Sequence, residues 1–151
     1  MDKIADSIKN FIINKVNAEL SGLTETGLTL PTISSADVVF GVVDLSRYEK
    51  PIIVSILPET QNETGDYIDG VNMDSTFIIT FLFQKIQYDK AMKRMCRYAK
   101  AFWLAQSKEP DFGDIEESEI TEIQYYPDTG AVAQQMTAFE LTLDVITEEK
   151  L

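Results

Sequence analysis

The chain has 151 residues, a formal net charge of −12 and no histidine, and 44% of its residues are hydrophobic. This length suits one domain that buries a core without disulfides or metals. The acidic balance argues against a general nucleic-acid binder, because contacts to phosphate need clustered lysine and arginine. Without histidine, the chain has no ready general base near neutral pH, so we expect no enzyme activity and no cofactor.

The first predicted element is an amphipathic helix from Asp2 to Glu19, which Ser21-Gly22 should end. Its apolar residues recur every three or four positions and should face the core: Ile4, Ile8, Phe11, Ile12 and Val16. From Leu23 to Ala36, the threonines, serines, Gly27 and Pro31 predict an extended linker.

Two short strands are expected next. Val38 to Val43 and Ile52 to Leu57 are rich in β-branched residues, and Pro58 should close the second strand. The acidic, glycine-containing segment from Glu59 to Asp74 then predicts the tip of a long hairpin whose arms extend beyond the sheet.

Four residues of this hairpin invite comparison with a calcium site: Asp66, Asp69, Asn72 and Asp74. Hard cations do prefer carboxylate and amide oxygens. The spacing does not match an EF-hand loop, however, so a solvated hairpin tip is the better interpretation.

The most apolar run, Phe77 to Phe83, has apolar residues on both parities, which is typical of a central strand. A helix from Tyr88 to Gln106 should follow it. One stripe of this helix is predicted to face the core: Tyr88, Met92, Met95, Cys96, Ala99, Phe102 and Trp103. Cys96 is therefore interpreted as a buried structural thiol and not as a nucleophile.

The same helix is a basic element in an acidic protein, since residues 88–107 carry a net charge of +4 and residues 108–151 carry −10. Its basic residues are predicted to lie away from the core stripe: Lys90, Lys93, Arg94, Arg97 and Lys100. They form either a solvated face or a docking face for an acidic surface. Reversing Arg94 and Arg97 to glutamate should then leave the fold intact and weaken assembly.

The chain offers such an acidic surface in the predicted loop from Glu109 to Glu119. The candidate residues are Asp111, Asp114, Glu116, Glu117 and Glu119. If they came from a neighbouring copy, docking on the basic helix would produce a head-to-tail ring.

Two more strands complete the prediction, Ile120 to Tyr126 and Thr137 to Val145, with Pro127 to Gly130 as a turn and Thr147 to Leu151 as an acidic tail. In the last strand, Phe139, Leu141, Leu143 and Val145 alternate with polar residues, so one face should be buried.

The order of helix, three strands, helix and two strands predicts an α+β fold in a single domain over residues 1–151. We expect a four- to five-stranded, mostly antiparallel sheet with two helices packed on one face. The other face would then leave apolar residues in need of cover: Ile78 and Leu82 with Val39, Val43, Ile53 and Leu57. An uncovered apolar patch of this kind would mark an interaction surface.

This layout resembles the tail-terminator and tail-completion proteins of long-tailed bacteriophages. The resemblance covers nearly the whole chain and depends on the opening amphipathic helix, the long hairpin, the Thr76-to-Gln84 strand that leads into the Tyr88-to-Gln106 helix, and the alternating strand from Thr137 to Val145. It implies a structural virion protein that forms a hexameric ring, caps the tail tube, stops its polymerisation and joins the tail to the head connector.

The resemblance also implies partners and a location. The partners would be the major tail-tube protein and the head-tail connector protein, with DNA passing through an acidic lumen that repels its phosphates. The protein would be assembled in the cytoplasm of a host bacterium and reside in the tail or neck of the virion. The predicted contacts to tube or connector are hairpin residues: Glu59, Glu63, Asp66, Tyr67, Asp69 and Asp74.

Two other classes remain open. An acidic DNA mimic would need carboxylates spaced like phosphates over one surface, and the basic helix interrupts that pattern. A small-molecule enzyme or ligand-binding domain would need a polar constellation that the sequence does not offer. The single cysteine cannot form an internal disulfide. No apolar run approaches the roughly 20 residues that span a bilayer, so we expect no membrane association.

Overall fold

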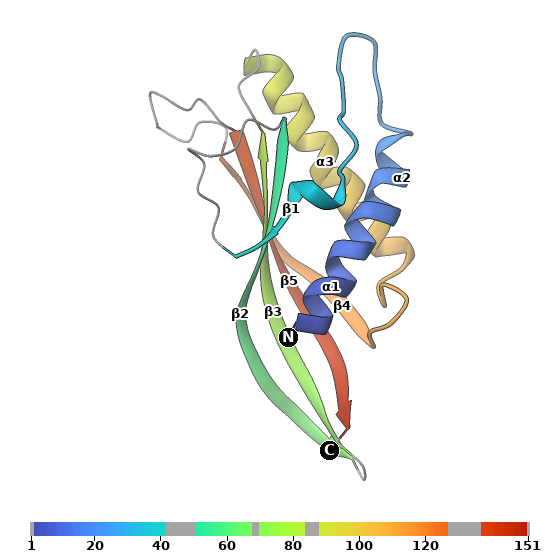
Figure 1. Cartoon of the computed structure of the whole chain (residues 1–151), viewed down its shortest axis with the longest axis vertical. Helices are drawn as coiled ribbons and strands as arrows, with labels where there is room; N and C mark the ends of the chain where they lie inside the picture. Colours follow the sequence, from blue (N-terminus) through green and yellow to red (C-terminus); the bar gives the residue numbers. More distant parts are fainter. Residues whose placement is uncertain (1, 42–50, 68–69, 84–87, 127–136, 151) are drawn as a thin grey trace.

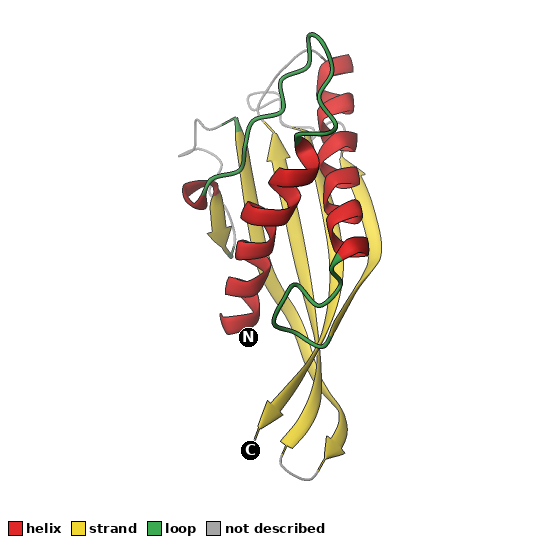
Figure 2. Cartoon of the chain, turned by 90° about the vertical axis from the view of Figure 1, so that its right-hand side faces the viewer, coloured by secondary structure: helices red, strands yellow, loops and turns green. Residues whose placement is uncertain are grey.

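A five-stranded mixed sheet carries both long helices on one of its faces (Figures 1 and 2). The computed structural model describes residues 2–41, 51–67, 70–83, 88–126 and 137–150. The strands are β1 (Val38–Phe40), β2 (Ile52–Tyr67), β3 (Gly70–Phe83), β4 (Glu117–Tyr126) and β5 (Thr137–Lys150).

The strand order across the sheet is β1-β2-β3-β5-β4. Only the β1–β2 pair is parallel among these neighbours, and the other three pairs are antiparallel. The predicted α+β class and order of elements are therefore confirmed. The predicted strand from Val38 is shorter than expected, since β1 ends at Phe40; Val42 and Val43 lie outside the described residues, as does the predicted turn from Pro127 to Gly130.

The first helix runs from Asp2 to Leu20 in three consecutive pieces. These are α1 (Asp2–Phe11), the π-helical η1 (Ile12–Val16) and α2 (Asn17–Leu20). All five residues of its predicted core stripe are buried. The amphipathic pattern thus identified both the helix and the face that it packs against the sheet.

The segment after this helix is packed and not merely extended. The Asn17 side chain accepts a hydrogen bond from the Ile33 amide at 2.9 Å and donates one to the Ile33 carbonyl at 2.8 Å. Ser34 and Asp37 then form a capping box on the short 3₁₀ helix η2 (Ser35–Asp37). The two bonds to Asn17 satisfy the backbone groups of Ile33, whose side chain joins the core together with Leu28.

The second long helix, α3 (Tyr88–Lys108), buries only part of the predicted core stripe. Met95, Ala99 and Phe102 are buried as expected, but Cys96 and Trp103 are exposed. The buried side extends the other way, through Ala91, Arg94, Tyr98, Ala101 and Ala105. The reason is that α3 packs not only on β4 and β5 but also against η1 and α2, which cover a second flank where small alanines fit.

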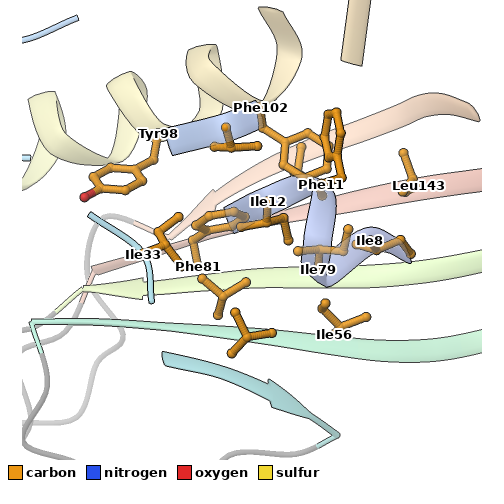
Figure 3. Close-up of a cluster of buried hydrophobic side chains, with 14 of the residues drawn as sticks. Ile8, Phe11, Ile12, Ile33, Ile56, Ile79, Phe81, Tyr98, Phe102 and Leu143 are labelled. Carbon is orange, nitrogen blue, oxygen red and sulfur yellow. The ribbon is translucent and has the colours of Figure 1, made fainter. Parts of the chain in front are cut away.

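The core lies between the sheet and the two helices (Figure 3). The Phe81 ring of β3 stacks on Phe139 of β5 with 4.6 Å between ring centroids and meets Phe102 of α3 edge-on at 6.2 Å. Phe11 of α1 in turn packs edge-on against Phe102 at 5.6 Å. Each buried aromatic ring of this kind contributes about 2 kcal/mol or more to stability.

The predicted hairpin tip is largely strand. Strand β2 does not end at Pro58, because it pairs with β3 as far as Tyr67 opposite Gly70. Strand β1 pairs with β2 only up to Ile56, so Pro58 lies on an open edge of the sheet. Proline has no backbone N–H to donate, and at this edge β1 offers no acceptor for one, so no hydrogen bond is lost. Register shifts at Pro58/Thr60 and Glu63/Gly65 adjust the pairing.

Strand β5 follows this extension to Lys150, so the predicted acidic tail from Thr147 is also wrong. Residues 60–67, 70–76 and 144–150 together form a three-stranded arm, which we call the projection. In Figure 1 it reaches well past the N-terminus of α1. The projection gives the molecule an elongated end that none of the described helices covers.

Candidate interaction surfaces

The basic side of α3 is largely occupied within the chain. Arg94 is only 8% exposed, and its Nε donates a hydrogen bond to the Thr29 carbonyl at 3.1 Å. Burial lowers the pKa of its guanidinium. The prediction that Arg94 lies on a solvated face is therefore wrong, because the segment after the first helix covers this flank of α3.

Two further basic residues bind the same segment. Lys93 Nζ and Arg97 Nη2 contact the two carboxylate oxygens of Glu25 at 2.8 and 2.7 Å, and Arg97 Nη1 also donates to the Leu23 carbonyl at 3.1 Å. The hydrogen bond from Lys93 lowers the pKa of Glu25. Lys90 and Lys100 are exposed and complete the predicted set. Whether these residues contact a partner stays a prediction.

The predicted acidic loop lies at the other end of α3. Phe112 anchors it by stacking on Phe11 at 4.0 Å, and the amide of Gly113 donates to Asp111 at 3.0 Å. The Ser7 hydroxyl donates to Asp114. The five predicted acidic residues are all exposed, although the last two belong to strand β4: Asp111, Asp114, Glu116, Glu117 and Glu119.

The predicted tube or connector contacts lie on or near the projection. Glu59 and Glu63 are exposed on β2, and Asp66 and Tyr67 belong to the last part of that strand. Asp74 is on β3, and Asp69 lies outside the described residues.

Asp74 has an unusual environment for a carboxylate. Its Oδ1 is buried without a hydrogen-bond partner. Burial, and next the nearby charge of Asp144, raise the pKa of Asp74. Asp144 itself accepts a hydrogen bond from Thr76 at 2.7 Å. These three side chains lie at the base of the projection, on the sheet face that the helices leave uncovered.

That uncovered face is less apolar than predicted. Ile53 is buried, Ile78, Leu82 and Val39 are half-buried, and Leu57 is exposed. Between the Ile53–Leu82 pair and the Leu57–Ile78 pair, the register places a polar row of Ser55, Thr80 and Glu140. The face is therefore not one continuous apolar patch.

A groove that the sequence did not predict lies at the β1 edge of the sheet. It has a volume of about 530 Å³, and Ile56, Phe40, Leu57 and Pro58 form its apolar lining. Phe40 is 49% exposed, and the Lys9 ammonium lies 5.5 Å from its ring centroid. Asp2 and Asp6 of α1 form an acidic rim. The sequence pattern predicted a strand at Phe40 but did not show that this strand lies at the edge of the sheet.

A second unpredicted surface lies at the opposite edge, where α3 meets β4. Trp103 is 52% exposed and Tyr125 is 44% exposed. Burial, and next a Coulombic effect of Cys96, raise the pKa of Tyr125. The buried side of α3 is turned around the helix axis relative to the predicted stripe. The one sequence signal that could have shown this is the set of alanines at 91, 101 and 105 on the buried side.

Two common kinds of feature are not found in the part of the chain that the structure describes. No group of three or more acidic or cysteine side chains there is arranged to hold a metal ion. Among the same residues, no helix combines the length and the hydropathy that a membrane span requires.

Comparison with solved structures supplies a likeness at the level of fold. No protein-family model and no curated protein sequence matches this chain. A chain from the virion of a native gene transfer agent particle matches with a TM-score of 0.52 and 13% identity, over 91% of this chain and 98% of that one.

The sheath/tube terminator of an extracellular contractile injection system, in its extended state, matches with a TM-score of 0.41 and 12% identity. That match covers 94% of this chain, which spans 57% of the terminator. The match to the gene transfer agent chain shows that the two chains share a fold, as the resemblance to phage tail proteins predicted.

Proposed function

We propose that this chain is a structural virion protein that caps the end of a phage-like tail tube, stops its polymerisation and joins the tail to the head connector. The observation that carries the proposal is the fold match to a gene transfer agent virion component over almost the full length of both chains. The sequence resemblance to tail terminators supplies the specific role within the virion.

In this proposal, six copies form a ring. The acidic balance of −12 per chain then has a use, because a negative lumen repels DNA phosphate and lets the duplex pass without sticking. The projection supports the proposal as well, since an elongated arm without helical cover offers backbone and side chains to a neighbouring ring (Figure 1). We assign it the contact with the tube or connector, through the exposed Glu59 and Glu63 among others.

The experiment is polymerisation of the cognate tail-tube protein with and without this protein, followed by light scattering. Substoichiometric addition should stop elongation, since capping needs only one ring per tube end. The variant Glu59→Lys/Glu63→Lys should cap less well, whereas Lys15→Gln on the remote first helix should cap like the wild type. Elongation at an unchanged rate with excess wild-type protein would refute the proposal.

A further inference from the structure

We infer that identical copies join head to tail, with the Trp103 side of α3 in one copy seated in the Phe40 groove of the next. This inference deepens the proposed function and depends on it for the ring. It commits to a second copy of this chain as the occupant of the groove.

The first surface is a protruding aromatic patch. On α3, Cys96, Lys100, Trp103 and Ser107 are exposed at spacings of three and four, so they form one outward stripe. The neighbouring Gln106 donates to the Ser118 carbonyl at 3.0 Å, which sets this flank of the helix against β4. Trp103 and Tyr125 thereby border the same edge. Tryptophan is among the residue types that are enriched in interface hot spots, and Trp103 is half exposed.

The second surface is the concave Phe40 groove. Its apolar lining matches a large aromatic side chain, and its volume of about 530 Å³ is ample for an indole ring. The charges are complementary also. Asp2 and Asp6 at the rim outnumber Lys9, whereas the patch around Trp103 carries Lys100. Burying Trp103 beside such a pair would combine apolar contact with charge steering.

The two surfaces lie at opposite edges of the sheet. The groove is at β1, the first strand in the sheet order, and the patch is at β4, the last. In Figure 2, β1 lies beside α1 at one side of the molecule and α3 lies at the other. Because each copy presents one surface at each edge, the contact is heterologous and repeats from copy to copy. Such a contact closes into a ring when its rotation permits.

The test uses two variants that each disable one surface, Trp103→Ala for the patch and Phe40→Ser for the groove. Both side chains are about half exposed, so circular dichroism should show an unchanged fold. By sedimentation at high concentration, each variant alone should self-associate at least about tenfold more weakly than the wild type. Mixed together, they should form a one-to-one dimer and nothing larger, because only one competent contact remains per pair.

Charge variants provide a second arm. Lys100→Glu and Asp6→Lys should each weaken association, and the double variant should restore it, while Lys15→Glu, at an exposed position on the first helix, should associate like the wild type. The native Cys96 thiol supplies a further readout, because its reaction with a thiol reagent should slow when wild-type copies assemble. Wild-type behaviour of Trp103→Ala and Phe40→Ser, or a wild type that stays monomeric alone and beside tube protein, would overturn the inference.

The outcome separates this inference from the proposed function. If the wild type caps tubes and Trp103→Ala caps equally well, the docking is wrong and the capping role stands. If copies associate through these two surfaces and never affect tube growth, the docking stands and the capping role is wrong.

Discussion

At the scale of single residues, the structure shows that charge on a helix is a poor guide to exposure. Arg94 was grouped with four other basic residues, yet its guanidinium is buried and bonded to a carbonyl 65 positions away in the sequence. No periodicity reveals a backbone partner so distant. Tyr98 likewise bonds to a backbone group that is distant in the sequence, since its hydroxyl donates to the Pro31 carbonyl. Burial raises the pKa of that hydroxyl.

This difference predicts opposite outcomes for two charge reversals on one helix. Arg94→Glu places a carboxylate in a buried site that faces a carbonyl oxygen, and it should cost on the order of 3 kcal/mol of unfolding free energy. Lys90→Glu is exposed in the first turn of α3, where a negative charge suits the helix dipole, so stability should be unchanged or slightly higher. Urea denaturation of both variants measures this, and equal losses would contradict the buried position of Arg94.

Asp74 predicts a pH dependence. Burial and the charge of Asp144 raise its pKa in the folded state above that of the unfolded chain, so the folded state favours the protonated form. Its contribution to stability is therefore full at acidic pH and is lost as the pH rises through the raised pKa.

Asp74→Asn should accordingly be more stable than the wild type at neutral pH, and the advantage should shrink as the pH falls into the ordinary carboxyl range. Thermal or urea unfolding across this pH range provides the measurement. Glu148→Gln, at an exposed position on β5, is the matched control and should show no such trend. An advantage of Asp74→Asn that stays constant with pH would contradict the environment described for Asp74.

At the scale of elements, the sequence predicted what local periodicity determines. The first helix packs the five residues that its pattern indicated, and Phe139, Leu141, Leu143 and Val145 are all buried on β5 as their alternation required. The ends of the strands were not predicted correctly where residues distant in the sequence determine the pairing. Pro58 and the glycines beyond it are turn signals, but on an open edge they are compatible with a bulged strand that continues to Tyr67.

The rotation of α3 predicts contrasting effects at two adjacent aromatic residues. Phe102 is fully buried against Phe11 and Phe81, so Phe102→Ala should cost about 3–5 kcal/mol. Trp103 is half exposed, so Trp103→Ala should change stability by no more than about 0.5–1 kcal/mol. Denaturant unfolding distinguishes the two, and a loss at Trp103 as large as the loss at Phe102 would mean that both rings face the core, as the predicted stripe required.

At the scale of the whole molecule, three surfaces lie outside the core and are candidates for assembly: the Phe40 groove, the aromatic patch around Trp103 and the projection. The groove and the aromatic patch lie at opposite sheet edges, and the projection extends past the helices. In the proposed ring, the edges would supply lateral contacts and the projection would supply axial contacts, which are the two directions that a stacked ring requires. The predicted basic and acidic interface residues belong partly to internal contacts, so their charge in the sequence does not tell which of them are available to a partner.

Electron microscopy of tail tubes grown in the presence of this protein tests the central claim most directly. We predict rings of six copies at one end of each tube, with shorter tubes as the ratio of this protein to tube protein rises. Tubes with bare ends and unchanged lengths, in the presence of excess folded protein, would contradict the account.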